Sequence, residues 1–424
     1  MNYKAPRGTH DLWGDKVNKL NHLNTICRKI FVKHNFSEVV TPTFEDAKLF
    51  SRSIGETTDI VEKEMYVFQD RKGRNLALRP EGTASLVRAY IENHLSQSDP
   101  IGKYFYIGPM YRYERPQAGR YREFFQVGAE YFGNNEPAAD AETIILSSEI
   151  FNAFGVTDAK IYLNTLGCSN CRPKFREAIK KYFATVKDLC DDCKRRIEKN
   201  PLRILDCKVD ADKFNNLPKM EDFLDKGCKE HFDKVQELLK GAGCEFVVDH
   251  KLVRGLDYYT RTVFEIRSKS VGSQDALAAG GRYDNLVREL GGAATPSIGF
   301  ALGSERVIMA AENLKILGNL EKPKVIFVAV SSKDLENQAF SFVSKLRAKT
   351  SKSKFMESIG QIDNISIEGP FADKSLKNQL RLSDKIKSVK TIIFGEEEFK
   401  KGLVVVKDMA SQKQEEIAID KILS

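Results

Sequence analysis

The alternation of apolar and polar residues divides the chain into helical and strand-like stretches. Between residues 16 and 34, apolar side chains recur every three or four positions, as on the buried face of a helix. Short aromatic and apolar runs then follow, separated by Gly, Pro and charged residues, which is typical of strands and turns. These runs lie at residues 66–68, 76–78, 104–107 and 124–127. We therefore expect a long helix packed against an antiparallel sheet.

The middle of the chain changes character. From residue 173 to about residue 239 the sequence is rich in Lys and Glu and helical in pattern. Strand patterns resume at residues 244–248 and 263–266. This order predicts a helical insertion, at about residues 170–240, inside a sheet-containing domain of residues 1–320.

The last quarter of the chain has a third pattern. Buried-type strands at residues 325–330, 391–394 and 403–406 alternate with helix-like segments. That alternation indicates a small α/β domain at residues 324–424, after a linker near residues 318–323. The predicted fold class is α+β with this α/β module appended.

Composition narrows the class of protein. A chain of 424 residues suits two or three domains, and it contains no apolar run long enough to cross a membrane. Its start is polar rather than secretory, so we expect a cytoplasmic protein with no membrane partner. The formal charge of +8 is a modest excess that would favour a polyanion only if the cations cluster. Eight cysteines fit reduced thiols or a metal site better than a disulfide framework.

A charged hairpin carries the first candidate chemistry. The run YRYERPQAGRYREFFQ at residues 111–126 reads as strand, loop, strand, with four arginines and two glutamates. Arginine offers a fixed fork of donors that suits phosphates and carboxylates. Composition alone fits a solvated, salt-bridged hairpin equally well.

The spacing within this hairpin resembles the second motif of the class II aminoacyl-tRNA synthetases. The run GFALGSER at residues 299–306 is similar to the third motif, and residues 35–42 are similar to the first, which forms the dimer interface in that family. The resemblance implies a homodimer that binds ATP with Mg²⁺ on its outer phosphates. The ATP-binding residues that it implies are Arg112, Glu114, Arg120, Phe124 and Arg306.

Two further stretches resemble signatures of the histidyl-tRNA synthetases. They are LVRGLDYY at residues 252–259 and AGGRYD at residues 279–284. An imidazole needs a donor, an acceptor and a flat apolar wall, and paired tyrosines supply both kinds of surface. Ordinary strand aromatics filling a core are the alternative for those tyrosines taken alone. The histidine-binding residues implied by the resemblance are Glu81, Gly82, Thr83, Arg112, Gln126, Glu130, Arg254, Tyr258 and Tyr259.

The resemblance also implies the reaction. Histidine would be activated with ATP to an adenylate and pyrophosphate, then transferred to the 3′ end of tRNA(His). Arg112 and Arg254 would be the catalytic residues, since they place positive charge at the α-phosphate. Arg115 and Gln117 would meet the acceptor end of the tRNA, and residues 324–424 resemble an anticodon-binding domain.

Two alternative functions remain open. A regulatory binding protein built on the same fold would be expected to lose the catalytic arginines and the last domain. A class II synthetase for another amino acid would lack the two histidyl-type signatures. The residues present favour the histidine enzyme over both.

The cysteines pose a separate question. Cys168, Cys171, Cys190 and Cys193 form two C-x-x-C pairs at a spacing that is typical of a four-thiolate zinc site. Zn²⁺ or reduced thiols are both compatible with this pattern. Cys207, Cys228 and Cys244 fit no ligand spacing, so we expect small buried side chains there.

Overall fold

The computed structural model describes most of the chain. It covers residues 3–55, 58, 60–207, 209–254, 256, 258–272, 275–317, 323–348, 354–359 and 364–424. The chain divides into two compact units, Met1–Gly318 and Asn319–Ser424. Of the linker expected near residues 318–323, residues 318–322 lie outside the described part of the chain. No helix among the described residues is long and apolar enough to span a membrane.

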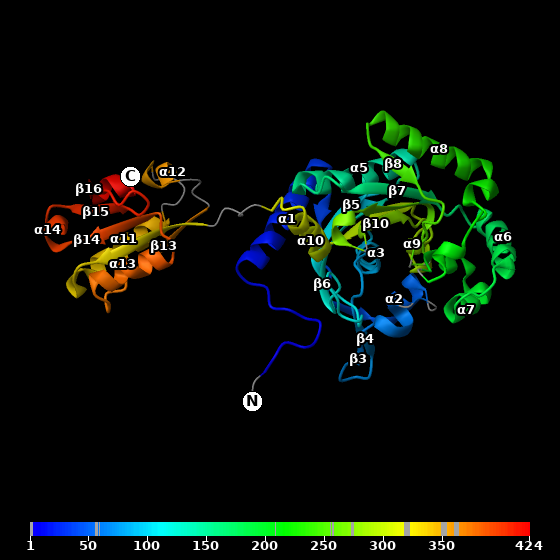
Figure 1. Ribbon diagram of the computed structural model, residues 1–424, viewed down its shortest axis with the longest axis horizontal. Helices are drawn as coiled ribbons and strands as arrows, with labels where there is room; N and C mark the ends of the chain where they lie inside the picture. Colours follow the sequence, from blue (N-terminus) through cyan, green and yellow to red (C-terminus); the bar gives the residue numbers. More distant parts are fainter. Residues whose placement is uncertain are drawn as a thin grey trace. The chain divides into compact units, whose positions relative to one another are not determined.

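An eight-stranded sheet forms the centre of the first unit, with the strand order β1-β5-β6-β11-β10-β9-β7-β8 (Figure 1). Its central strands are antiparallel, as expected, and only the edge strands β1 and β8 run parallel to their neighbours. The strands are β1 Ser37–Glu38, β5 Lys103–Tyr111, β6 Glu123–Phe132, β7 Lys160–Thr165, β8 Phe246–Val248, β9 Thr260–Arg267, β10 Ala276–Arg282 and β11 Ser297–Gly303.

One face of this sheet holds the main core. Helix α1 (Asp15–Lys33) confirms the helix predicted from the first periodic stretch, and it packs beside α5 (Pro137–Phe154) and α10 (Ser304–Asn313). Phe31 of α1 and Phe151 of α5 are fully buried in this core. The apolar period of α1 is therefore explained by its contact with the sheet.

The opposite face of the sheet carries polar and aromatic side chains. Successive residues of a strand point to opposite faces, so Val127 and Ala129 of β6 enter the main core while Gln126 and Glu130 face the other way. Helices α3 (Thr83–Glu92) and α9 (Leu286–Glu289) belong to this second face. The remaining elements nearby are α2 Ala47–Ile54, η1 Ile60–Glu64, α4 Leu95–Ser98, η5 Lys269–Val271 and a small sheet of β2 Phe44–Asp46, β3 Val67–Gln69 and β4 Asn75–Leu78.

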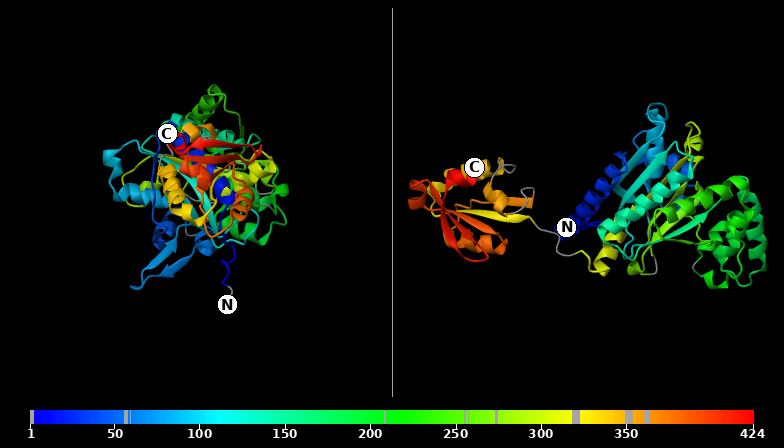
Figure 2. Two further views of the ribbon diagram at one scale, coloured as in Figure 1. Left: turned by 90° about the vertical axis from the view of Figure 1, so that its left-hand side faces the viewer. Right: turned by 90° about the horizontal axis from the view of Figure 1, so that it is seen from above.

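The helical insertion is present between β7 and β8, and the views agree that α6 and α7 lie at the side of the unit (Figures 1 and 2). Its last helix differs from expectation: α8 packs on α5, and Phe232, Val235 and Leu239 join the main core. Only the part before α8 has a small core of its own, around Phe175 and Ile179. The insertion elements are α6 Cys171–Thr185, α7 Asp191–Lys199, η2 Pro201–Asp206, η3 Ala211–Lys213, η4 Met220–Phe223 and α8 Lys226–Gly241.

The second unit is the expected α/β module, with a five-stranded sheet in the order β13-β12-β14-β15-β16. Gln379, buried on α13, donates to the carbonyl of Val330 and accepts from its amide, which fastens the helix to β12. The elements are β12 Lys324–Val330, η6 Lys333–Leu335, α11 Glu336–Ala348, α12 Lys354–Ile359, β13 Ile365–Glu368, α13 Leu376–Lys385, β14 Lys390–Phe394, α14 Glu396–Lys400, β15 Leu403–Asp408, β16 Gln414–Ala418 and α15 Ile419–Leu423.

Candidate active site

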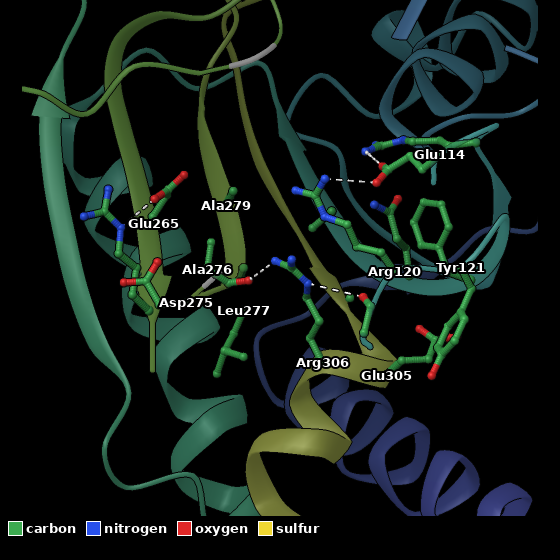
Figure 3. Close-up of a pocket in the computed structure, with 18 of the residues that line it drawn as sticks. Glu114, Arg120, Tyr121, Glu265, Asp275, Ala276, Leu277, Ala279, Glu305 and Arg306 are labelled. Atoms are coloured by element: carbon green, nitrogen blue, oxygen red, sulfur yellow. Dashed lines mark hydrogen bonds and ion pairs between the residues drawn. The ribbon is translucent and has the colours of Figure 1, made fainter. Parts of the chain in front are cut away.

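A cavity of about 420 Å³ opens on the polar face of the large sheet (Figure 3). Strands β9, β10 and β11 form its floor, and the charged hairpin between β5 and β6 forms one wall. Seven residues that the sequence singled out line it together: Arg112, Glu114, Arg120, Phe124, Gln126, Arg254 and Arg306. Segments far apart in the sequence thus converge on one polar pocket.

The hairpin arginines are organised around Glu114. Its carboxylate lies 3.1 Å from Nη1 of Arg120 and 3.8 Å from Nη1 of Arg112. Arg112 also donates from Nε to the carbonyl of Pro80 at 2.8 Å, and its guanidinium lies 5.3 Å from the ring centre of Phe124. Both guanidinium groups therefore reach the pocket in fixed positions, as binding of an anion requires.

The start of α10 forms another wall of the cavity. Arg306 donates from Nη1 to the carbonyl of Ala276 at 2.6 Å and from Nε to that of Gly119 at 3.4 Å, so it joins β10 to the hairpin. Burial and the neighbouring charge of Arg120 lower the pKa of Arg306. Glu305 accepts the amide hydrogen of Phe125, and burial raises its pKa to about 7. An incoming polyphosphate would relieve the repulsion between the two arginines.

Arg254 lies in the loop before β9 and pairs with Glu265 of that strand. The second oxygen of Glu265 lies 2.7 Å from Nε of Arg267, which also pairs with Asp249 at 2.9 Å. Glu265 is therefore a positioning residue that sequence analysis missed, although a carboxylate inside an apolar strand was a visible signal. Gly255 and Asp257 of the same signature lie outside the described residues.

Beside the cavity lies a cluster of buried polar side chains centred on Glu130. Thr83 donates to one oxygen of Glu130 at 2.6 Å, and the hydroxyl of Tyr283 donates to the other at 2.5 Å. Glu81 accepts the amide hydrogens of Thr83 and Ala84 at 2.7 and 2.9 Å, so it caps the start of α3. Both carboxylates are buried close to one another.

Aromatic rings surround this cluster. The rings of Tyr258 and Tyr259 lie 4.7 Å apart, and Tyr283 lies 5.7 Å from Tyr258. Tyr106 lies against Gly82, where any side chain would collide with its ring. Tyr258 and Tyr259 are thus brought to the predicted site, and Tyr106 and Tyr283 are additions. The alternation of β5, which turns Tyr104 and Tyr106 to one face, was the signal for Tyr106.

The electrostatics of the cluster around Glu130 favour an incoming cation. Burial raises the pKa of Glu130 to about 8, and the nearby charge of Glu81 adds to this effect, while hydrogen bonds from Thr83 and Tyr283 oppose it. Burial also raises the pKa of Glu81. A cationic ligand would offset the desolvation of these carboxylates and favour their charged forms.

Gly299 of β11 lies opposite Glu130 of β6, and a Cβ there would overlap the Glu130 carboxylate and lie 2.7 Å from the carbonyl of Ala129. Overpacking of this kind costs about 1–3 kcal/mol, so we expect Gly299→Ala to lower the activity of the site by about tenfold or more. Gly241→Ala is the matched control, because nothing lies within 4 Å of a Cβ at that position. Equal activity of the two variants would contradict this role of Gly299.

The remaining predicted residues lie apart from the cavity. Arg115 and Gln117 are exposed at the tip of the hairpin, where the backbone of Gln117 pairs with that of Arg120. They are accessible to a large ligand approaching the pocket mouth.

The cysteines group differently from the expected four-thiolate site. Cys168 and Cys171 meet Asp225 and Cys228, whereas Cys190 and Cys193 meet Cys207 and Asp210. Cys207 and Cys228 are buried, as expected, and each also belongs to one of these groups, which the spacing of the cysteines did not indicate. Cys244 belongs to neither group.

Comparison with known proteins agrees with this architecture. A family model described as histidyl-tRNA synthetase matches residues 8–171 and 175–307, and one described as an anticodon binding domain matches residues 324–424. Histidine–tRNA ligase from Endomicrobium trichonymphae is 56% identical over 421 residues, covering 99% of this chain and 100% of that protein. The corresponding ligase from Thermotoga maritima is 43% identical over 423 residues, covering 99% of this chain and 97% of that protein.

Solved structures give the same result. Apo histidyl-tRNA synthetase from S. aureus matches with a TM-score of 0.81 and 31% identity, covering 100% of this chain and 99% of that one. A protein from Bacillus halodurans described as an ATP phosphoribosyltransferase regulatory subunit/histidyl-tRNA synthetase, at 18% identity and a TM-score of 0.66, shares the fold. The matching family models, the full-length relatives and the convergence of both signatures on one pocket show that this chain belongs to the histidyl-tRNA synthetase family.

Proposed function

We propose that this chain is a histidine–tRNA ligase, which activates L-histidine with ATP and transfers the histidyl group to tRNA(His). The observation that carries the proposal is the single site formed by an arginine-lined cavity and the adjoining buried cluster that holds the carboxylates of Glu81 and Glu130. The cavity suits a nucleotide, and the adjoining pocket suits a small cationic amino acid. A regulatory protein would have no need of Arg112, Arg254 and Arg306 around one cavity.

Activation requires the carboxylate of histidine to attack the α-phosphorus of ATP, with pyrophosphate as the leaving group. No nucleophile from the protein takes part. Arg112 and Arg254 are proposed to stabilise the charge that builds on the α-phosphate, because fixed positive groups act most strongly where water is excluded. Arg120 and Arg306 would hold the outer phosphates, while Glu114 and Phe124 would contact the adenine base.

Recognition of histidine is assigned to the buried pocket. The carboxylate of Glu130 accepts a hydrogen bond from the imidazole, while Glu81, Thr83 and Gln126 hold the α-ammonium group. Gly82 leaves room for Tyr106, and the rings of Tyr258 and Tyr259 supply the flat wall. A charge-assisted contact to a buried carboxylate is stronger than a neutral one.

Mg²⁺ is proposed to accompany ATP, where it would neutralise charge on the outer phosphates. The carboxylate of Asp275 lines the same cavity as the arginines. Such oxygen ligands, together with substrate phosphates, fit the coordination that Mg²⁺ prefers.

The tRNA is proposed to engage both units, with its anticodon on residues 324–424 and its acceptor end at the hairpin tip. We expect Arg115→Ala to lower transfer of histidine to tRNA by about tenfold, the equivalent of one charged contact, with adenylate formation unchanged. Single-turnover transfer and ATP–pyrophosphate exchange separate the two steps. The exposed Arg71→Ala is the control, and a variant at Arg115 that alters neither step would refute the assignment.

Homodimer formation is proposed from the family and from apolar exposure near the first motif. Val40, beside β1, is 84% exposed, and Phe44 lies 6.3 Å from Phe68 in a pair of exposed rings on the small sheet. Exposed apolar groups of this kind commonly mark an interface. The cytoplasmic location and the domain limits of 1–320 and 324–424 stay predictions.

The decisive test of the function is ATP–pyrophosphate exchange with each of the twenty amino acids in turn and no tRNA. Exchange with histidine alone is the expected result. Exchange with another amino acid would mean that the buried pocket has been misassigned, and no exchange from folded protein would favour a regulatory role.

A further inference from the structure

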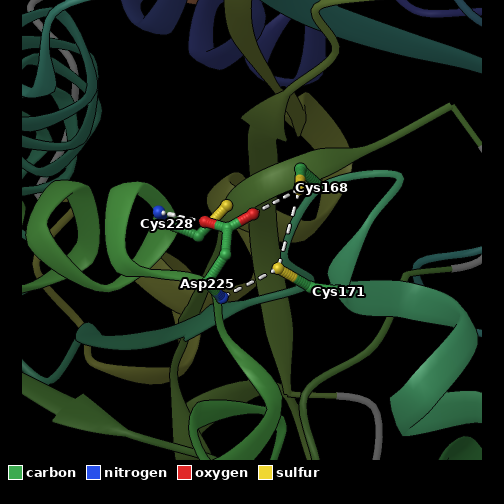
Figure 4. A group of neighbouring side chains, drawn as sticks. All are labelled: Cys168, Cys171, Asp225 and Cys228. Carbon is green, nitrogen blue, oxygen red and sulfur yellow. Dashed lines mark hydrogen bonds between the residues drawn. The ribbon is translucent and has the colours of Figure 1, made fainter.

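We propose that the helical insertion holds two structural zinc ions, each bound by three cysteine thiolates and one aspartate. The first site consists of Cys168, Cys171, Asp225 and Cys228 (Figure 4). The second consists of Cys190, Cys193, Cys207 and Asp210. Within each group, one ligand atom from every residue lies within 4.8 Å of all the others.

The distances between ligand atoms fit a tetrahedral ion. Sγ of Cys168 lies 3.6 Å from Sγ of Cys171, and Sγ of Cys190 lies 3.8 Å from that of Cys207. With Zn–S bonds of about 2.3 Å, tetrahedral geometry places two sulfurs about 3.8 Å apart. With Zn–O bonds of about 2.0–2.2 Å, a sulfur and an oxygen ligand are about 3.5–3.7 Å apart. The sulfur–carboxylate separations of 3.1 Å for Cys168 and Asp225 and 3.9 Å for Cys207 and Asp210 lie on either side of that value.

The two sites share one construction. Each combines a C-x-x-C pair with a second pair at the same spacing, in which one cysteine is replaced by aspartate: D-x-x-C in the first site and C-x-x-D in the second. The pairs Cys168–Cys171, Cys190–Cys193 and Asp225–Cys228 each enter a helix, α6, α7 and α8. The unpaired amides at a helix start stabilise thiolates.

Backbone amides also donate hydrogen bonds to the proposed metal ligands. The amide of Asn170 donates to Sγ of Cys168 at 3.4 Å, and that of Asp225 donates to Sγ of Cys171 at 3.2 Å. In the second site, Asp210 accepts from the amide of Cys190 at 2.9 Å and pairs with Lys213 at 2.8 Å. Outer contacts of this kind orient metal ligands and offset the negative charge of a three-thiolate site.

Disulfides, iron clusters and harder metal ions fit the grouping less well than zinc. A disulfide would use two of three sulfurs and leave a third thiol and a carboxylate without a shared role. A multi-iron cluster needs more space than the 4.8 Å spread allows, and thiolates are poor ligands for Mg²⁺ or Ca²⁺. A single soft divalent ion uses all four groups.

The location explains why such ions would be useful. Part of the insertion's small core consists of the cysteines themselves, Cys171, Cys193, Cys207 and Cys228. A bound metal ion would add folding free energy to a segment in which these thiols take up core positions. The second site joins the start of α7 to the turns that follow it, wholly within the insertion.

The first site lies where the insertion leaves and rejoins the catalytic unit. Cys168 follows β7, and Cys228 begins α8, whose later turns are in the main core. The backbone of Leu166 and Gly167 pairs with that of Arg261, two residues after Tyr259 of the proposed histidine pocket. Leu166, Arg254 and Tyr259 also line one cavity. Loss of the first ion should therefore disturb activation more than loss of the second.

The test is the zinc content of the full chain, purified without added metal or chelator. We expect about two zinc ions per chain, about one in Cys228→Ser and in Cys190→Ser, and about two in the control Cys244→Ser. Replacement of zinc by Co²⁺ should give the absorption of a tetrahedral thiolate complex. All eight cysteines should react as thiols after denaturation with chelator and without reductant.

The wild-type content and the cobalt spectrum decide the proposal even if a variant fails to fold. Zinc well below one per chain, fewer than eight titratable thiols, or loss of zinc in Cys244→Ser would each overturn it. One ion per chain would overturn the two-site form. These measurements do not depend on the proposed enzymatic function.

Discussion

Arg254→Ala should reduce histidine-dependent ATP–pyrophosphate exchange by about 10²–10³-fold, the usual effect of removing a group that stabilises charge in a transition state. Glu265 holds the Arg254 guanidinium in the cavity that Arg112 and Arg306 also line. The loss should lie in kcat rather than in KM for ATP, because the contact strengthens as charge builds on the α-phosphate.

Arg254→Lys tests whether charge alone is sufficient. Lysine keeps the charge but lacks the planar fork, so we expect it to recover only part of the lost rate. The exposed Arg71→Ala should behave as wild type. An Arg254→Ala variant that retained full exchange would remove this residue from the mechanism.

Glu130→Gln should raise KM for histidine by about 10–100-fold, since a charge-assisted hydrogen bond is worth about 1.5–3 kcal/mol. Glu130 is 1% exposed and already accepts from Thr83 and Tyr283, so glutamine preserves shape but cannot take on the negative charge that a bound cationic group would favour. KM for ATP should change little, because the predicted ATP contacts lie in the adjoining cavity. Exchange kinetics with histidine and ATP varied separately measure both constants.

The same substitution should change the pH dependence of stability. Burial raises the pKa of Glu130 from 4.5 to about 8, so the folded protein holds a proton there that the unfolded chain loses above its ordinary pKa. The stability due to this proton is fully present below about pH 4.5 and is lost as pH rises towards 8. Glu130→Gln lacks this loss, so the unfolding temperature of the variant minus that of wild type should rise between about pH 5 and pH 8 and then level off.

Other groups also titrate in this range, Glu305 among them with its pKa raised to about 7, so the informative quantity is the difference between variant and wild type. Parallel curves across the pH range would contradict the buried, uncharged state of Glu130. An unchanged KM for histidine would instead contradict its contact with the substrate. The two roles can therefore fail separately.

Local sequence patterns were sufficient to predict several helices and strands and to single out residues that line the candidate site. The apolar period at residues 16–34 predicted α1, and the aromatic runs at residues 104–107 and 124–127 predicted β5 and β6. The hairpin spacing singled out Arg112 and Glu114, which the structure places at one pocket. These signals are local, because side-chain period and motif spacing depend on residues a few positions apart.

Long-range packing explains what was missed. Helix α8 reads like the rest of the Lys-rich insertion, yet its apolar face packs on α5 in the main core. Glu265 pairs with Arg254 across a loop and a strand, and no local pattern specifies that contact. The cysteine pairs were assigned to one another because they are neighbours in sequence, whereas each meets a partner from further along the chain.

The sequence by itself determined the family, the succession of helices and strands, and the residue types available for binding ATP and histidine. Only the tertiary structure decided which of those residues share a pocket, how deeply Glu130 is buried, and that Asp225 and Asp210 complete two separate cysteine groups. The physical reason is that desolvation and ligand geometry depend on distances between atoms, and folding sets those distances between residues remote in the chain.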